Sequence, residues 1–246
     1  MTYRYKVSIE YEGTGYSGWQ KQTNAKTTQG EIEKSLQQFS QEKIVTHGMG
    51  RTDAGVHAIA QIAHFDLEKK WDTNTVLQGI NYFLKPQPIV ITGCEIVSND
   101  FHARHSAKKR TYQYVILNRF ANPALDKNRA WHVSKNLDVQ KMEEASKLLI
   151  GKHDFTSFRT TLCEAKSPVK TIEYIRFNIE GERITIEICA ESFLHHMVRN
   201  IVGFLQLIGS GKKTANDLKE YLEANDVHII KYTAPACGLY FTKVEY

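Results

Sequence analysis

The stretch Tyr3-Arg4-Tyr5-Lys6-Val7-Ser8-Ile9-Glu10-Tyr11 alternates between apolar or aromatic residues and polar or charged ones. Successive side chains of a β-strand point to opposite faces of a sheet, so this alternation predicts a half-buried antiparallel strand over residues 3–11. The chain therefore begins with a strand that turns one face toward a core.

Further elements of the same kind are predicted behind this strand. Thr28-Gln29-Gly30-Glu31 has the pattern of a capping box, and the apolar stripe Ile32, Leu36 and Phe39 follows it at helical spacing. We then expect a strand over residues 58–65, a helix over 75–83 and a strand over 89–94.

A second cycle of strands and helices follows. It comprises a strand over 111–117, a helix from Asp138 to Gly151, a hairpin of strands 170–179 and 183–190, a helix over 195–208, a helix capped by Thr214 and a strand over 238–246. Two such cycles predict an α+β fold of two pseudo-symmetric halves, residues 1–105 and 106–246, built from ferredoxin-like or RRM-like strand–helix–strand units. Since no low-complexity linker separates the halves, we expect them to share an antiparallel sheet.

The composition is typical of a folded protein, and its positive charge favours binding to a polyanion. The 246 residues are 41% hydrophobic and carry a net charge of +5. No basic segment followed by an apolar run opens the chain, and no apolar stretch is long enough for a bilayer, so we predict neither a signal peptide nor membrane contact. The cysteines lie far apart, which argues against a zinc site or a disulfide framework and favours the cytoplasm.

A cluster of cations and rings lies near the middle of the chain. The cations are Arg104, Lys108, Lys109, Arg110 and Arg119, and the rings among them are Phe101, Tyr112 and Tyr114. Cations that meet phosphates beside rings that stack on bases are typical of an RNA-binding surface. A solvated charged face is the alternative, and it accounts for the cations but not for the rings.

The segment Gly50-Arg51-Thr52-Asp53-Ala54-Gly55-Val56-His57-Ala58 holds one carboxylate among glycines. It is too rich in glycine for a helix interior and too charged for a core strand, so we expect a turn. A carboxylate on such a turn can approach a substrate closely, and Arg51 can pair with it or with a substrate anion. An aspartate in an ordinary surface turn is the alternative.

The predicted helix around Arg199 is apolar almost all round, so we expect it to be largely buried. A buried guanidinium needs an acidic partner, and Asp53 is a candidate. Another acid, or extension of the arginine to the surface, remains an alternative.

The sequence gives little support for a dinucleotide-binding site or for a metal site. Gly13-Thr14-Gly15-Tyr16-Ser17-Gly18 matches a dinucleotide-binding motif, but no helix is predicted at its third glycine. His47, Asp53, His57 and His64 lack the helical spacing of a zinc motif, so no metal site is predicted.

Six blocks of residues resemble the tRNA pseudouridine synthase A (TruA) family in the family's order. The blocks are Gly50–Ala58, Phe101–Arg104, Arg110–Tyr114, His153–Arg159, Phe193–Gly203 and Gly238–Tyr240. The resemblance extends over essentially the whole chain. The resemblance implies an isomerase that converts uridine to pseudouridine at positions 38, 39 and 40 of the anticodon stem-loop of tRNA, with no metal or organic cofactor. It also implies a basic central cleft between the halves, a homodimer and a cytoplasmic location.

The resemblance assigns a role to each matching residue. Asp53 would be the catalytic aspartate, Arg51 would help to hold the target base out of the stack, and Arg199 would pair with the catalytic aspartate. Tyr112 would lie against the base, and Leu239 would form an apolar wall of its pocket. The tRNA contacts would be Phe101, His102, Ala103, Arg104, His105, Leu162, Cys163, Glu164, Ala165 and Lys166.

The residues leave two points of function open. The carboxylate can act as a nucleophile at the sugar or base, or as a base at the ribose, and the sequence does not distinguish these routes. Two other classes of protein are alternatives: an RNA stem-loop-binding protein without activity, and a cofactor-dependent oxidoreductase that uses the first glycine loop.

Overall fold

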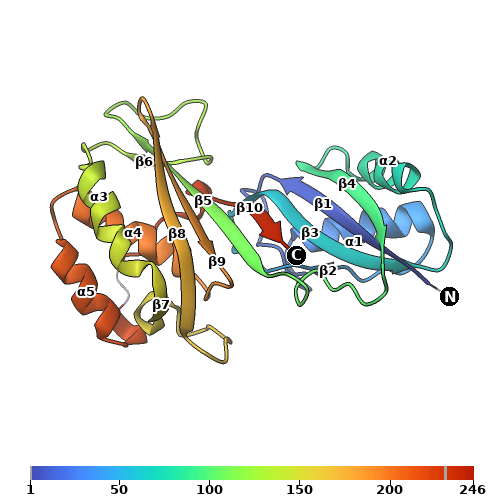
Figure 1. The fold of residues 1–246 in the computed structure, drawn as a ribbon. Helices are drawn as coiled ribbons and strands as arrows, with labels where there is room; N and C mark the ends of the chain where they lie inside the picture. Colours follow the sequence, from blue (N-terminus) through green and yellow to red (C-terminus); the bar gives the residue numbers. More distant parts are fainter. Residues whose placement is uncertain (1, 230–231) are drawn as a thin grey trace. The chain divides into compact units, whose positions relative to one another are not determined.

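The computed structural model describes residues 2–229 and 232–246 and divides them into two compact units. Unit 1 comprises the chain up to Lys108 together with Tyr240–Tyr246, and unit 2 comprises Lys109–Leu239. The elements are labelled in Figure 1. Each unit is an α+β structure built on its own set of strands.

Unit 1 contains four principal strands in the order β4 (Ile89–Val97), β1 (Tyr3–Tyr11), β3 (His57–Leu67) and β10 (Leu239–Glu245). β1 runs antiparallel to β3 and β4, whereas β10 pairs with β3 in parallel. The short strand β2 (His47–Gly48) also pairs with β3. The predicted alternation in β1 is confirmed, because Tyr5, Val7, Ile9 and Tyr11 are all buried.

Two helices complete unit 1. α1 (Thr28–Ser40) and α2 (Thr73–Leu84) pack against each other, and α2 also packs against β4. The predicted capping box at Thr28 is wrong: Thr27 is the N-cap, and its side chain accepts from the backbone of Gly30. The third helical residue is thus a glycine, which has no carboxylate to return the bond.

Unit 2 contains an antiparallel series of strands in the order β5 (Lys109–Asn118), β9 (Arg183–Ala190), β8 (Val169–Glu180) and β7 (Gly151–Asp154). The predicted hairpin at Glu180-Gly181-Glu182 joins β8 to β9 and is confirmed. Neither β7 nor β6 (Trp131–Val133), which pairs with β5, was predicted from the sequence. These short strands carry too few residues for a periodic signal.

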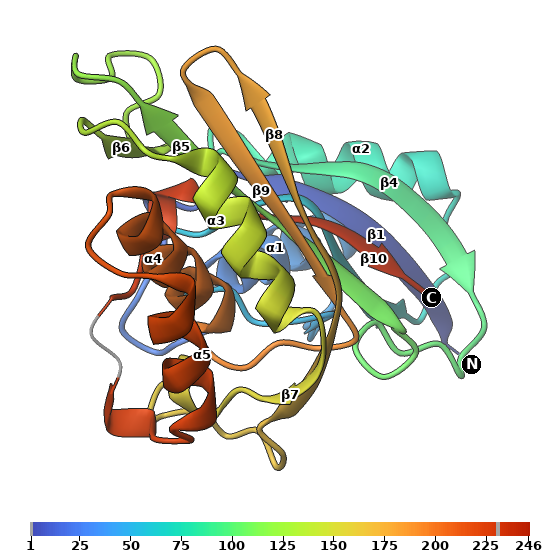
Figure 2. The same ribbon diagram turned by 60° about the vertical axis from the view of Figure 1, so that its left-hand side comes forward.

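Helices α3 (Val139–Ser146), α4 (Met197–Gly209) and α5 (Ala215–Glu223) gather on one face of the unit 2 strands (Figures 1 and 2). Asp138 and Thr214 cap α3 and α5 as predicted. Four short 3₁₀ turns lie at Lys147–Leu149, Thr156–Phe158, Val227–Ile229 and Ala236–Gly238. No helix in the described part of the chain is long and apolar enough to cross a membrane.

The units differ from the predicted halves at the C-terminus. We predicted that all of 106–246 lies in the second half, whereas Tyr240–Tyr246 belongs to unit 1. The reason is the pairing of Tyr240 with His57 and of Phe241 with Ala58. A parallel pairing between residues so far apart in sequence leaves no local pattern to read.

Candidate active site

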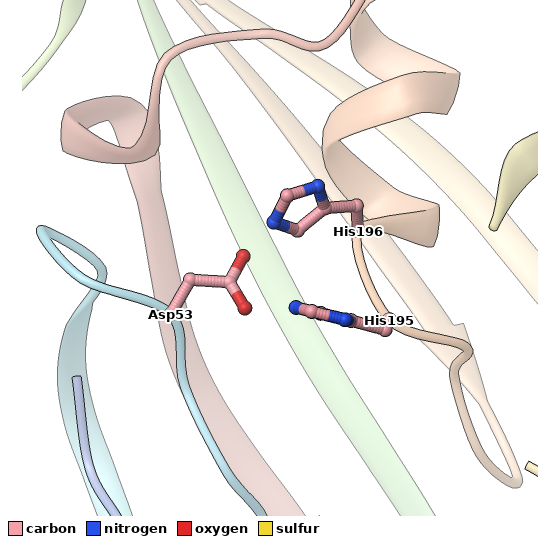
Figure 3. Close-up of side chains that lie close together, drawn as sticks. All are labelled: Asp53, His195 and His196. Carbon is pink, nitrogen blue, oxygen red and sulfur yellow. The ribbon is translucent and has the colours of Figure 1, made fainter. Parts of the chain in front are cut away.

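Asp53 lies in the loop that leads into β3, and His195 and His196 lie directly before α4 (Figure 3). The loop is a turn, as predicted, and the N–H of Val56 closes it by donating to the carbonyl of Asp53 at 3.2 Å. Asp53 is half-buried, while Arg51 and Ala54 on either side of it are exposed. The turn therefore holds the Asp53 carboxylate in a half-buried position just before β3.

The residue directly before Asp53 is anchored in the interior of unit 1. The buried side chain of Thr52 shares a hydrogen bond of 2.8 Å with the hydroxyl of Tyr11 on β1. Burial raises the pKa of Tyr11 to about 12, so this phenol stays protonated. The backbone of Thr52 also accepts from the N–H of Trp19 at 3.0 Å.

The glycine loop over residues 13–18 supports this turn. A Cβ on Gly13 would lie 2.0 Å from the carbonyl oxygen of Val56, so only glycine permits the observed backbone approach. The N–H of Gly13 donates to Nδ1 of the buried His57 at 3.0 Å. No helix begins at Gly18, because α1 starts at Thr28. The structure thus assigns the loop a packing role and removes the basis for a dinucleotide site.

Arg51 contacts the other side of the same loop region. Its Nε donates to Oε1 of Gln20 at 3.2 Å, and its side chain is exposed. This bond holds the guanidinium near the loop that bears Asp53.

Tyr112 and Arg199 belong to unit 2. The ring of Tyr112 on β5 meets that of Phe193 edge to face, with centroids 5.2 Å apart. Arg199 lies in the first turn of α4, where its Nε donates to the carbonyl of Ala234 at 2.8 Å and Nη1 lies 3.1 Å from Nε2 of His196. The helix is largely buried, as predicted, but it begins only at Met197, and Arg199 near its start is itself half-buried.

Leu239 follows a tightly packed glycine. A Cβ on Gly238 would lie 2.6 Å from the ring of Tyr114, whose hydroxyl donates to the carbonyl of Pro235 at 2.7 Å. Burial raises the pKa of Tyr114. Leu239 itself is buried, at 6% exposure, as an apolar wall requires.

The two predicted tRNA-contacting segments have ordered supports within their own units. In unit 1, Arg104 and His105 are exposed and Ala103 is buried. In unit 2, Leu162, Glu164 and Lys166 are exposed, while Cys163 and Ala165 are half-buried. A contact that the sequence did not predict joins the second segment to His195. The N–H of His195 donates to Sγ of Cys163 at 3.5 Å, and its Nδ1 lies 3.1 Å from Oγ1 of Thr160.

The histidines of unit 1 do not form the metal site considered from the sequence. His57 and His64 each direct Nδ1 at a backbone N–H, from Gly13 and from Ala103 respectively. Among the described residues of either unit taken by itself, no three His, Cys, Asp or Glu side chains bring their ligand atoms close enough together to hold an ion. These residues do not fit a metal centre inside either unit.

The chain matches a protein family over most of its length. The family model for tRNA pseudouridine synthase matches residues 7–106 and 145–246. Proteins named tRNA pseudouridine synthase A from Rhodospirillum rubrum and Paramagnetospirillum magneticum are each 46% identical over 243 residues, which is 99% of this chain and 87% and 95% of those proteins. A solved Cbf5-Nop10-Gar1 complex is similar over 98% of this chain and 48% of that one, at 12% identity and a TM-score of 0.43.

Proposed function

Since this chain belongs to the tRNA pseudouridine synthase family, we propose that Asp53 is the catalytic carboxylate with which it isomerises uridine to pseudouridine in tRNA. The observation that carries the proposal is the construction of the turn. Thr52 is tied to Tyr11 on β1, and the carbonyl of Asp53 accepts from Val56 directly before β3, so the backbone that bears Asp53 is held on both sides. A carboxylate on a fixed backbone can be placed repeatedly at one atom of a substrate.

The reaction needs such a group. The bond between N1 of uracil and C1′ of ribose must break, the base must turn, and a bond from C5 to C1′ must form. C5 must also lose its proton, and N1 must gain one. A carboxylate serves either by adding to the sugar or base or by removing a ribose proton. We propose Asp53 for this role without choosing between these routes.

The neighbouring roles follow from the family. We propose that Tyr112 lies against the target base, that Leu239 forms an apolar wall beside it, and that Arg199 pairs with Asp53 during the reaction. Support comes from the local structure: Tyr112 is steadied by Phe193, and Arg199 by Ala234. A base inside a stem cannot be reached by Asp53, so the nucleotide has to leave the stack, and Arg51 would hold it out.

The finer description of the substrate is also a proposal. We propose that the enzyme acts in the anticodon stem-loop, at positions 38, 39 and 40, as a cytoplasmic homodimer. Residues 101–105 and 162–166 would contact the RNA, with Arg104 and Lys166 among the phosphate ligands. Both cations are exposed, as such contacts require.

An unmodified tRNA transcript tests the function directly. We expect incubation with the enzyme to produce pseudouridine at uridines 38, 39 and 40, detected by chemical mapping at single-nucleotide resolution. Transcripts in which one of these uridines is replaced by cytidine serve as matched controls and should lose one signal each. Binding of the transcript with no conversion at any uridine would instead support the inactive RNA-binding alternative, and conversion elsewhere would overturn the proposed positions.

A further inference from the structure

Side chains from β1, from β3 and from the residue after β10 hold the segment between β4 and β5 in place. Arg4 on β1 donates to the carbonyls of Asn99 and Phe101, and it binds Asp66 on β3 through two bonds of 2.7 and 2.8 Å. Tyr246, which follows β10, donates from its hydroxyl to the carbonyl of Ala103 at 3.0 Å. In these bonds the carbonyl groups of Asn99, Phe101 and Ala103 are the acceptors.

Two histidines bind the N–H groups of the same segment. Nδ1 of the buried His64 accepts from Ala103 at 3.2 Å. Nδ1 of His102 accepts from Arg104 at 3.1 Å and from His105 at 3.3 Å. The segment forms neither helix nor strand here, so three of its backbone donors rely on imidazole acceptors.

These bonds define the chemical state of both rings. A backbone N–H can only donate, so each Nδ1 must carry a lone pair, and the proton of the neutral ring is on Nε2. A protonated ring has N–H groups at both positions and loses the bonds at Nδ1. A metal ion at Nε2 would likewise move the proton to Nδ1, which argues against a metal role.

The surroundings favour the neutral rings. Burial, then the neighbouring His47, Arg4 and His102, lower the pKa of His64 to about 4, while Asp66 acts in the opposite sense. The pKa of His102 is lowered by its burial and then by His105, His47, Arg4 and Arg104. The rings of His47, His64, His102 and His105 follow one another with centroids 4.9, 4.7 and 4.3 Å apart.

We propose that His64 and His102 are positioning residues for tRNA binding: their Nδ1 atoms hold the backbone of residues 103–105 and thereby present Arg104 to the phosphates of the RNA. Ala103 is buried and Arg104 is exposed, so the held turn places its cation on the outside. This role rests on the proposed contact of residues 101–105 with tRNA.

Two substitutions of His102 test whether the hydrogen-bond acceptor Nδ1 is the part of the side chain that matters. Asparagine keeps an acceptor near the place of Nδ1 and does not titrate, whereas leucine has similar bulk and no acceptor. We expect His102→Leu to raise KM for a tRNA transcript roughly fivefold with little change in kcat, because two N–H groups lose their partner. His102→Asn should recover most of that loss, and equal KM values for the two variants would overturn the proposal.

The dependence of KM on pH gives a second test, because the two possible roles of His102 predict opposite changes in KM. As the pH is lowered from 7.5, we expect KM of the wild type to rise relative to His102→Asn, because protonation of His102 releases the turn. A wild-type KM that falls relative to His102→Asn on acidification would identify the imidazolium as a phosphate contact and overturn the positioning role.

Arg104→Gln distinguishes this proposal from the one on which it rests. If Arg104→Gln raises KM and His102→Leu does not, the tRNA contact stands and the positioning role is wrong. If Arg104→Gln leaves KM unchanged, the contact itself is wrong and the positioning role falls with it. Absence of conversion by the wild type would contradict the proposed function instead.

Discussion

The hydroxyl of Tyr11 and the side chain of Thr52 share a hydrogen bond of 2.8 Å in the interior of unit 1. Thr52 directly precedes Asp53, so the bond ties the proposed catalytic carboxylate to a central strand. Neither group is exposed enough to replace its partner with bulk water, at 3% and 8% exposure. The backbone at Asp53 is thus anchored by a contact between two buried side chains.

Tyr11→Phe tests that dependence. The change leaves the buried Thr52 hydroxyl without this partner, so we expect a loss of about 1–2 kcal/mol in the free energy of unfolding. We also expect kcat to fall severalfold while the Kd for tRNA is unchanged. Tyr3→Phe, on the same strand, is the control and should leave both quantities near the wild type; a normal kcat in Tyr11→Phe would show that the turn does not need this anchor.

Gly13→Ala tests the close approach of the glycine loop to the Asp53 turn. The added Cβ would lie 2.0 Å from the carbonyl oxygen of Val56, so the loop or the turn must move. We expect a lower melting temperature and a lower kcat. Gly15→Ala is the matched control, since a Cβ at Gly15 meets nothing within 4 Å; equal effects of the two substitutions would refute the packing role.

His64 makes stability depend on pH. The pKa of its folded-state ring is about 4, against 6.5 for the ordinary side chain. Below about pH 6.5, His64 of the unfolded chain binds a proton, whereas His64 of the folded chain stays neutral. The free energy of unfolding therefore decreases as pH falls toward 4, by up to about 3 kcal/mol. Above pH 6.5 this contribution to the pH dependence vanishes.

Urea unfolding of the wild type and His64→Asn across pH 7.5 to 4 measures this effect. Both proteins share the other titrating groups, so the difference between their unfolding free energies isolates His64. We expect the wild type to lose stability relative to His64→Asn on acidification; parallel curves would contradict the depressed pKa.

Tyr112 separates a ring effect from a hydroxyl effect. Tyr112→Phe keeps the edge-to-face contact with Phe193, whereas Tyr112→Leu removes it. If the ring lies against the target base, kcat/KM should fall much more in the leucine variant than in the phenylalanine variant. A larger loss in Tyr112→Phe would instead assign the function to the hydroxyl.

Local patterns predicted most of the fold. The alternation in β1, the hairpin at Gly181 and the caps at Asp138 and Thr214 all appear as expected, because each depends on residues close together in sequence. The pairing of β10 with β3 was not predicted, since nothing near Tyr240 reports its partner His57. The start of α4 was placed two residues early because His195 and His196 continue its pattern.

The site was predicted less completely than the fold. The turn that bears Asp53 could be predicted from its own residues, but its supports Tyr11 and Gly13 lie about 40 residues away in sequence. The histidine acceptors His64 and His102 were also missed, because their role depends on which ring nitrogen faces which N–H. A pattern of residue types does not carry that information.

Asp53→Asn tests the central claim most directly. Pseudouridine formation and tRNA binding are measured for this variant, with the exposed Glu143→Gln on α3 as a control for the loss of a carboxylate. The amide keeps the shape of the side chain but can neither add as a nucleophile nor take a proton. We expect no pseudouridine from Asp53→Asn, with a Kd for tRNA within about threefold of the wild type, which is less than 1 kcal/mol. Pseudouridine formation at the wild-type rate would contradict the account.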